Sequence, residues 1–146
     1  MKAATLVLVL MTAACGAWAQ ATPAGLWKTI DDKTKTERAL VRISETGGVF
    51  SGRVEKVLAA DVEPGARCDK CEDDRKDQPM LGMEILRAVK KGAADNLWDG
   101  GTILDAREGK VYKVRLQTTE GGRKLDVRGY IGMPMLGRTQ TWLRVE

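Results

Sequence analysis

Two cysteines, Cys68 and Cys71, are the residues of this chain best suited by type and spacing to chemistry. A Cys-x-x-Cys pair can form a disulfide, act as a redox dithiol or supply two thiolates to a zinc site. A redox pair usually lies at a helix N-terminus, whereas the acidic neighbours Asp69 and Glu72 disfavour a thiolate here. No second cysteine pair completes a zinc site. For an exported protein, a disulfide within the loop is the expected state.

Histidine is absent from the whole chain. Its absence excludes Ser-His-Asp and Cys-His catalysis and histidine metal clusters, and removes the most common general base. Asp99 and Asp105 flank one expected strand, but aspartates beside glycines at strand ends usually form turns. The pairs Gly47-Gly48 and Gly100-Gly101 lack the following helix that a phosphate-binding loop requires. We therefore predict no catalytic residues, no cofactor and no metal site, and interpret the chain as a non-enzyme.

Aromatic residues and arginines form the second group of candidates, as a possible ligand pocket or a plug of the interior. They are Trp27, Trp98, Tyr112, Tyr130, Arg138, Trp142 and Arg144. As plugs they need no ligand, although a buried indole N–H or phenol O–H needs a hydrogen-bond partner. Arg138 or Arg144 stacked on Trp27 would add a cation–π contact. The alternative is an amphipathic pocket, where an arginine meets an anionic head group and the aromatic rings meet an apolar tail.

The N-terminus has the pattern of an export signal. Lys2 supplies a positive charge, Ala3–Ala14 is apolar, and Ala17-Trp18-Ala19 precedes Gln20 as an A-x-A cleavage site. The apolar run is shorter than the roughly 20 residues that a transmembrane helix needs. We therefore predict cleavage after Ala19 and a periplasmic or secreted protein with no transmembrane span in the mature chain.

A lipoprotein anchored through Cys15 is the less favoured alternative. Small residues precede this cysteine, but Thr12 occupies the position where such signals usually carry leucine. In either case residues 1–19 are assigned to the signal and residues 20–146 to a single domain, because the chain of 146 residues is too short for two ordinary domains.

The charge balance is mildly basic, with 24 Lys and Arg against 20 Asp and Glu. The basic residues are scattered along the polar faces of expected strands and form no block, which is typical of solvated surfaces. An exported domain with this distribution is not expected to bind nucleic acid.

Strict alternation of apolar and polar residues predicts an all-β protein. The expected strands are Gly25–Ile30, Arg38–Ser44, Val49–Leu58, Met80–Val89, Asn96–Leu104, Lys110–Thr118, Lys124–Ile131 and Arg138–Glu146. Met80–Val89 also fits a helical stripe, although we favour a strand, with a turn at Lys90-Lys91-Gly92. Ala59–Pro79 is predicted to be a long loop. About eight strands joined mostly by short turns favour a small antiparallel up-and-down barrel, because closure removes sheet edges. Its interior is either filled by side chains or holds one small ligand.

An opening Gly25-x-Trp27 and a late Arg138-Thr139-Gln140-Thr141-Trp142-x-Arg144 make the chain similar to lipocalin-like (calycin) barrels. In those barrels a tryptophan of the first strand is covered by an arginine from near the last strand. More specifically, the chain resembles the bacterial family known as Domain of Unknown Function 2147. The shared features are Gly25-Leu26-Trp27, Ile43, Gly52-Arg53-Val54, Cys68-x-x-Cys71, Gly82-x-x-Ile85-Leu86, Trp98-x-Gly100-Gly101-x-Ile103-Leu104-Asp105, Gly109-Lys110-x-Tyr112, Leu125-x-Val127-Arg128-Gly129-Tyr130-Ile131-Gly132 and Gly137-Arg138-Thr139-Gln140-Thr141-Trp142. Ala106 is a departure, since the family often has proline there.

The resemblance implies an exported calycin-like barrel of unassigned biochemical role, and it transfers no catalytic residues. By this analogy we expect a binding module for a small amphipathic or lipid-like ligand, or for an envelope component. The alternative is a structural or interaction protein with a filled barrel, acting through its cysteine-containing loop. The sequence does not predict the ligand or the oligomeric state.

Overall fold

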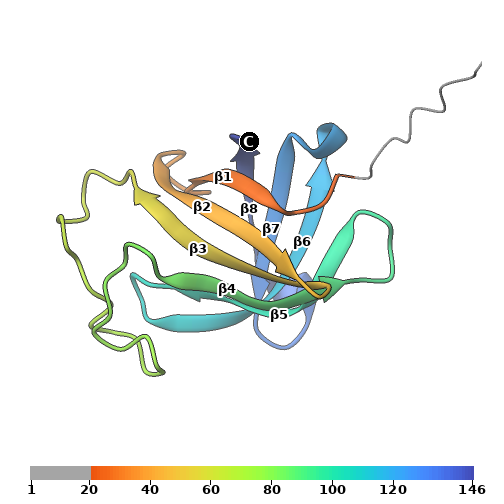
Figure 1. The fold of residues 1–146 in the computed structure, drawn as a ribbon. Coiled ribbons are helices and arrows are strands. Elements are labelled where there is room, and N and C mark those ends of the chain that lie inside the picture. Colours follow the sequence, from red (N-terminus) through yellow and green to blue (C-terminus); the bar gives the residue numbers. More distant parts are fainter. Residues whose placement is uncertain (1–20) are drawn as a thin grey trace, which may run out of the picture.

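Eight antiparallel strands follow one another around a closed barrel, each paired with its neighbours in the sequence (Figure 1). The computed structural model describes residues 21–146, so the predicted signal peptide lies outside the described residues. The strands are β1 (Gly25–Ile30), β2 (Glu37–Thr46), β3 (Val49–Val57), β4 (Glu84–Lys91), β5 (Leu97–Asp105), β6 (Lys110–Thr119), β7 (Lys124–Tyr130) and β8 (Arg138–Arg144). Two 3₁₀ turns, η1 (Glu120–Gly122) and η2 (Pro134–Leu136), lie in the connections after β6 and β7. The predicted all-β, antiparallel up-and-down barrel of eight strands is therefore confirmed.

The alternation in the sequence corresponds to the two faces of the barrel wall. Val41 and Ile43 of β2, like Val114 and Leu116 of β6, are buried inside, while their sequence neighbours are less buried. Burying one apolar side of every strand drives the sheet to close on itself, since a flat sheet would leave that side in water.

The segment Met80–Val89 is only partly a strand. β4 begins at Glu84 and continues to Lys91, so the strand prediction is wrong for Met80–Met83 and the predicted turn at Lys90-Lys91 is also wrong. Lys90 and Lys91 pair with Asp99 and Trp98 of β5, which extends the strand. Met80–Met83 instead belongs to the preceding loop, and two backbone hydrogen bonds with Val54 hold it. The Val54 N–H donates to the Met83 carbonyl at 2.9 Å, and the Val54 carbonyl accepts from the Gly82 N–H at 2.8 Å.

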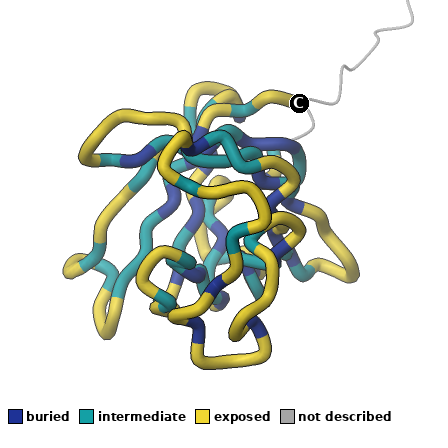
Figure 2. Tube along the Cα trace, turned by 90° about the vertical axis from the view of Figure 1, so that its left-hand side faces the viewer, coloured by how far each residue is buried: buried dark blue, intermediate teal, exposed yellow. Residues whose placement is uncertain are grey.

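The connections divide between the two ends of the barrel, as they must when successive strands run in opposite directions. The β1–β2, β3–β4, β5–β6 and β7–β8 connections share one end, which we call the mouth (Figure 1). The β2–β3, β4–β5 and β6–β7 connections share the opposite end with the C-terminus. Seen toward the long β3–β4 loop, exposed connections surround strand segments that are largely buried or half-buried (Figure 2).

Side chains fill the end of the barrel opposite the mouth. Trp27, Phe50, Trp98, Leu116 and Leu125 belong to the main core cluster and are at most 4% exposed. A second, smaller cluster of Cys68, Cys71, Met83 and Leu104 lies where the β3–β4 loop packs on the barrel. The interior is thus packed at one end, and the mouth end is available for a cavity.

Candidate functional site

A cavity of about 600 Å³ occupies the mouth end of the barrel. Its inner wall is mostly apolar, with Thr29 and Gln140 as polar members. The apolar residues come from strands around the barrel and, for Met83, from the β3–β4 loop: Val41, Val54, Met83, Ile85, Ile103, Leu104, Val127 and Trp142. Its outer lining includes exposed residues such as Lys33, Glu108 and Leu136, so the cavity opens to solvent at this end. The volume lies within the roughly 300–1,000 Å³ that is usual for small-molecule pockets.

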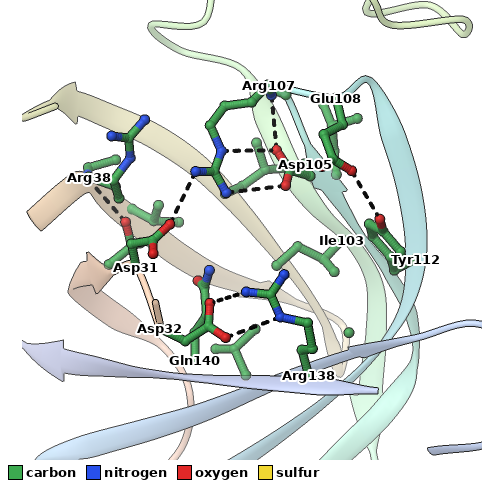
Figure 3. A pocket seen from close by; sticks show the side chains of 18 of the residues that line it. Asp31, Asp32, Arg38, Ile103, Asp105, Arg107, Glu108, Tyr112, Arg138 and Gln140 are labelled. Carbon is green, nitrogen blue, oxygen red and sulfur yellow. Dashed lines mark hydrogen bonds and ion pairs between the residues drawn. The ribbon is translucent and has the colours of Figure 1, made fainter. Parts of the chain in front are cut away.

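Ion pairs between neighbouring connections form the rim of the cavity (Figure 3). Arg138 at the start of β8 donates to Asp32 through Nε at 3.1 Å and Nη2 at 2.5 Å. Arg107 of the β5–β6 turn donates through Nη1 to Asp31 at 3.1 Å and also contacts Asp105. The Arg107 and Arg138 side chains are 49% and 58% exposed, so solvent screening keeps the stabilisation from these pairs small. They still hold three connections in a defined arrangement.

Asp31 anchors the rim from within the fold. Only 5% of this residue is exposed, and one carboxylate oxygen accepts the backbone N–H groups of Lys33 and Thr34, each at 2.9 Å. The backbone hydrogen bond from Thr34 is the main cause that holds the pKa of Asp31 well below its ordinary value. Together with the hydrogen bonds from Lys33 and Arg107 it outweighs burial, which acts in the opposite direction. The hydrogen bond from Arg138 likewise lowers the pKa of Asp32. Both carboxylates are therefore ionised at neutral pH.

The guanidinium groups at the rim retain donors for a ligand. Arg138 uses Nε and Nη2 on Asp32, and its Nη1 makes no hydrogen bond to any residue between 21 and 146. Tyr112 donates its hydroxyl to Glu108 at 3.4 Å, a long and weak bond. Polar groups at the rim above an apolar wall can accommodate a molecule with a polar head and an apolar body.

The predicted site residues divide into two groups: one lines the cavity and the other belongs to the packed end of the barrel. Tyr112, Tyr130, Arg138 and Trp142 line the cavity, while Trp27, Trp98 and Arg144 do not. The Trp142 indole, 1% exposed, donates to Gln140 at 3.1 Å within the cavity wall. The Trp27 indole donates to the carbonyl of Pro23 at 2.7 Å, and Arg144 stacks over its ring. Arg138 pairs with Asp32 at the mouth, so of the two predicted stacking partners only Arg144 covers Trp27.

The predicted disulfide between Cys68 and Cys71 is present, with both residues at most 1% exposed. It packs against Met83 and Leu104, which also line the cavity, so it supports the cavity wall from outside. The β5–β6 turn packs closely against the β3–β4 loop, because a Cβ added to Gly109 would lie 1.9 Å from the Lys70 carbonyl oxygen. Residues 21–146 contain no group of three or more Cys, Asp or Glu side chains arranged to hold a metal ion.

Of the charged rim, only Arg138 is among the site residues predicted from the sequence. Asp31, Asp32 and Arg107 are not among them. A signal for the rim does exist in the sequence. In an up-and-down barrel, alternate connections share an end. The charged residues that follow the first and fifth strands therefore lie at the same end of the barrel as the charged residue that begins the eighth strand. Alternation in the sequence does not identify Ile103 as an inward residue, because a strict period of two counted from Trp98 points Thr102 and Leu104 inward. The register shift between Trp98 and Gly101 turns Ile103 toward the interior instead.

The fold and the site define a class of protein: a closed eight-stranded antiparallel barrel with one packed end and a cavity that opens at the other end. The chain belongs to the family described as an uncharacterized protein conserved in bacteria (DUF2147), whose family model matches residues 25–144. Among solved structures, a protein from the human pathogen Helicobacter pylori, HP1028, described as belonging to the lipocalin family, is similar with a TM-score of 0.73. It is 20% identical, and the match covers 86% of this chain and 84% of that chain, which shows a shared fold. No curated protein matches the chain. Within the described residues, no helix has the length and apolar character needed to cross a membrane.

Proposed function

We propose that the chain is a binding protein for a small amphipathic, lipid-like ligand. The observation that carries this proposal is the cavity of about 600 Å³, whose inner wall is mostly apolar and whose charged lining residues, among residues 21–146, gather at the mouth. An apolar tail placed against Val41, Val127 and Trp142 would leave water, at a gain of roughly 25 cal/mol per Å² of buried apolar surface. The polar head group would remain at the rim beside Arg107 and Arg138.

The same observation weighs against the alternative of a filled barrel that acts only through its cysteine-containing loop. A filled interior leaves no space of this size, and protein interiors normally contain few voids larger than a water molecule. The proposal assigns no catalytic step to the chain. The burial of Cys68 and Cys71, at most 1% exposed, supports this reading, because redox-active cysteines are usually partly exposed.

Export to the periplasm or the cell exterior is a further part of the proposal, motivated by the signal pattern of residues 1–19. The intact mass of the protein recovered from its native host tests it. A chain beginning at Gln20 is expected. A chain that begins at an acylated Cys15 would show that the protein is lipid-anchored. An uncleaved chain would overturn the proposal of export through a removable signal.

The ligand proposal is tested by titrating the protein with a fluorescent fatty-acid analogue and by mass spectrometry of gently extracted protein. The variant Ile103→Trp places an indole in the cavity and is expected to weaken binding of the analogue at least about tenfold. Val111→Trp is the matched control, because Val111 on the adjacent strand is 44% exposed and does not line the cavity. Absence of any binding by the wild-type protein, or equal binding by both variants, would reject the proposal.

A further inference from the structure

The β7–β8 connection exposes an unusual concentration of apolar side chains. Ile131, Met133, Met135 and Leu136 are 69%, 54%, 73% and 74% exposed, and they are four of the eight large apolar side chains that are exposed in residues 21–146. Single exposed apolar residues need no explanation, but a cluster in one short segment indicates an interaction surface. Figure 1 shows this connection projecting at the opposite end of β8 from the C-terminus.

The connection holds this apolar cluster in an ordered turn. Arg128 of β7 donates to the carbonyl of Pro134 at 2.5 Å and to that of Met135 at 3.3 Å. Within η2, the Gly137 N–H donates to the Pro134 carbonyl at 3.2 Å. The Arg128 side chain thus holds the backbone of the connection through charge-assisted hydrogen bonds. The side chains of Met133 and Met135 remain exposed to solvent.

Basic residues lie on the outer wall next to this connection. Lys113 and Arg115 are on the outward face of β6, and Arg115 is paired in register with Arg128 of β7. Like charges placed opposite each other destabilise a sheet unless an anion neutralises them. Lys113 and Arg115 form no salt bridge within the described part of the chain, and the Nε atom of Arg115 is buried there without a hydrogen-bond partner. An apolar tip beside unneutralised cations is complementary to a surface with an apolar interior and anionic head groups.

We propose that the β7–β8 connection docks on the surface of an anionic phospholipid bilayer, with Met133, Met135 and Leu136 entering the interfacial layer. Lys113 and Arg115 are then the cations that meet lipid phosphates, while Arg128 keeps holding the backbone of the connection. Binding of this kind combines buried apolar area with electrostatic attraction and does not require the chain to span the membrane. Ile131 and Leu136 also line the cavity, so the docked connection places the mouth against the bilayer. This step rests on the proposed function. With the mouth against the bilayer, the ligand would be a membrane lipid, or a fatty acid derived from one, that enters the cavity directly from the bilayer.

The test is co-sedimentation of the folded protein with vesicles of phosphatidylethanolamine and phosphatidylglycerol, compared with vesicles of phosphatidylcholine alone. Wild-type protein is expected to bind the anionic vesicles, and binding should weaken as salt is raised. The double variant Met133→Glu/Met135→Glu is expected to weaken binding at least about tenfold. The variant Lys113→Gln/Arg115→Gln should also weaken it, by roughly fivefold for each cation removed. Val145→Glu is the matched control, because Val145 is 50% exposed near the C-terminus, and it should bind as the wild type does.

Failure of this inference is distinguishable from failure of the proposed ligand binding. Met133 and Met135 do not line the cavity, so the double methionine variant should bind the fluorescent fatty-acid analogue in solution with unchanged affinity. Wild-type protein that binds the analogue but ignores anionic vesicles would overturn the docking proposal alone. Vesicle binding that survives the methionine changes would also overturn it. A wild-type dimer that this variant converts to monomer would assign the apolar connection to a second copy of the chain instead.

Discussion

The guanidinium of Arg144 lies 4.2 Å from the ring centre of Trp27, and the two residues are register partners across the seam where β8 meets β1. The seam is short, with Trp27–Arg144 and Lys28–Leu143 as its paired positions, and bonds between Leu26 and residues 145–146 extend it. Arg144 also donates to the carbonyls of Gly122 at 2.6 Å and Ala24 at 2.8 Å. One side chain therefore covers the core, ties η1 to the N-terminal segment and closes the barrel.

Replacing Arg144 by alanine is expected to lower the free energy of unfolding by roughly 2–4 kcal/mol, because a cation–π contact and several charge-assisted hydrogen bonds are lost together. Urea denaturation followed by tryptophan fluorescence measures this change. Arg123→Ala is the control: its side chain is 80% exposed, so a change within about 0.5 kcal/mol is expected. Equal effects of the two substitutions would contradict the closing role of Arg144.

Asp31 predicts a pH dependence of stability. Its pKa is lowered in the fold, mainly by the Thr34 backbone hydrogen bond, so its stabilisation is complete above the unfolded-state pKa of about 3.9 and is lost as the pH falls through the folded-state value. Asp31→Asn should cost roughly 1–3 kcal/mol at pH 7 and progressively less below about pH 4. Urea denaturation at pH 7 and pH 3 measures both values. The exposed Asp95→Asn serves as control, and a cost for Asp31→Asn that is the same at both pH values would disprove the role of its charge.

The disulfide is expected to stabilise the β3–β4 loop without being required for the barrel. Closing so short a loop contributes roughly 2 kcal/mol on a chain-entropy estimate. The double variant Cys68→Ala/Cys71→Ala should therefore still fold, but limited proteolysis should cut its β3–β4 loop faster than that of the wild-type protein. Reductant should accelerate cleavage of the wild type and leave the variant unaffected. Loss of the β-sheet circular dichroism signal in the variant would show that the disulfide supports the whole fold.

Gly109 is expected to tolerate no side chain. Its φ of 69° lies in the left-handed region, and an added Cβ would meet the Lys70 carbonyl oxygen. Gly109→Ala should destabilise the protein by more than about 1 kcal/mol and separate the β5–β6 turn from the cysteine-containing loop. Thermal unfolding measures the loss. Gly65→Ala separates the two causes, because Gly65 has a φ of 78° but nothing within 4 Å of an added Cβ, so it should cost less.

The positions of most strands were predictable because each strand turns one face toward the core. Alternate residues of a strand are therefore apolar. The segment Lys124–Tyr130 illustrates this: Leu125 and Val127 are at most 3% exposed, as the pattern predicts. Met80–Met83 was mispredicted because its backbone pairs with Val54 outside regular strand geometry, an arrangement that leaves no periodic signal. The Cys68–Cys71 disulfide was predicted from the expected export of the chain to an oxidising compartment, because the spacing alone also fits a redox pair or a zinc site.

By itself, the sequence predicted an antiparallel barrel and most of the side chains that face inward. A period of two assigns a residue to a face but contains no information about its height along the barrel axis. That height depends on strand register and stagger, which are properties of the assembled sheet. Only the tertiary structure therefore placed Trp27 and Arg144 in the packed end and Trp142 and Arg138 around the cavity, and decided that inward-facing Ile103 borders open space.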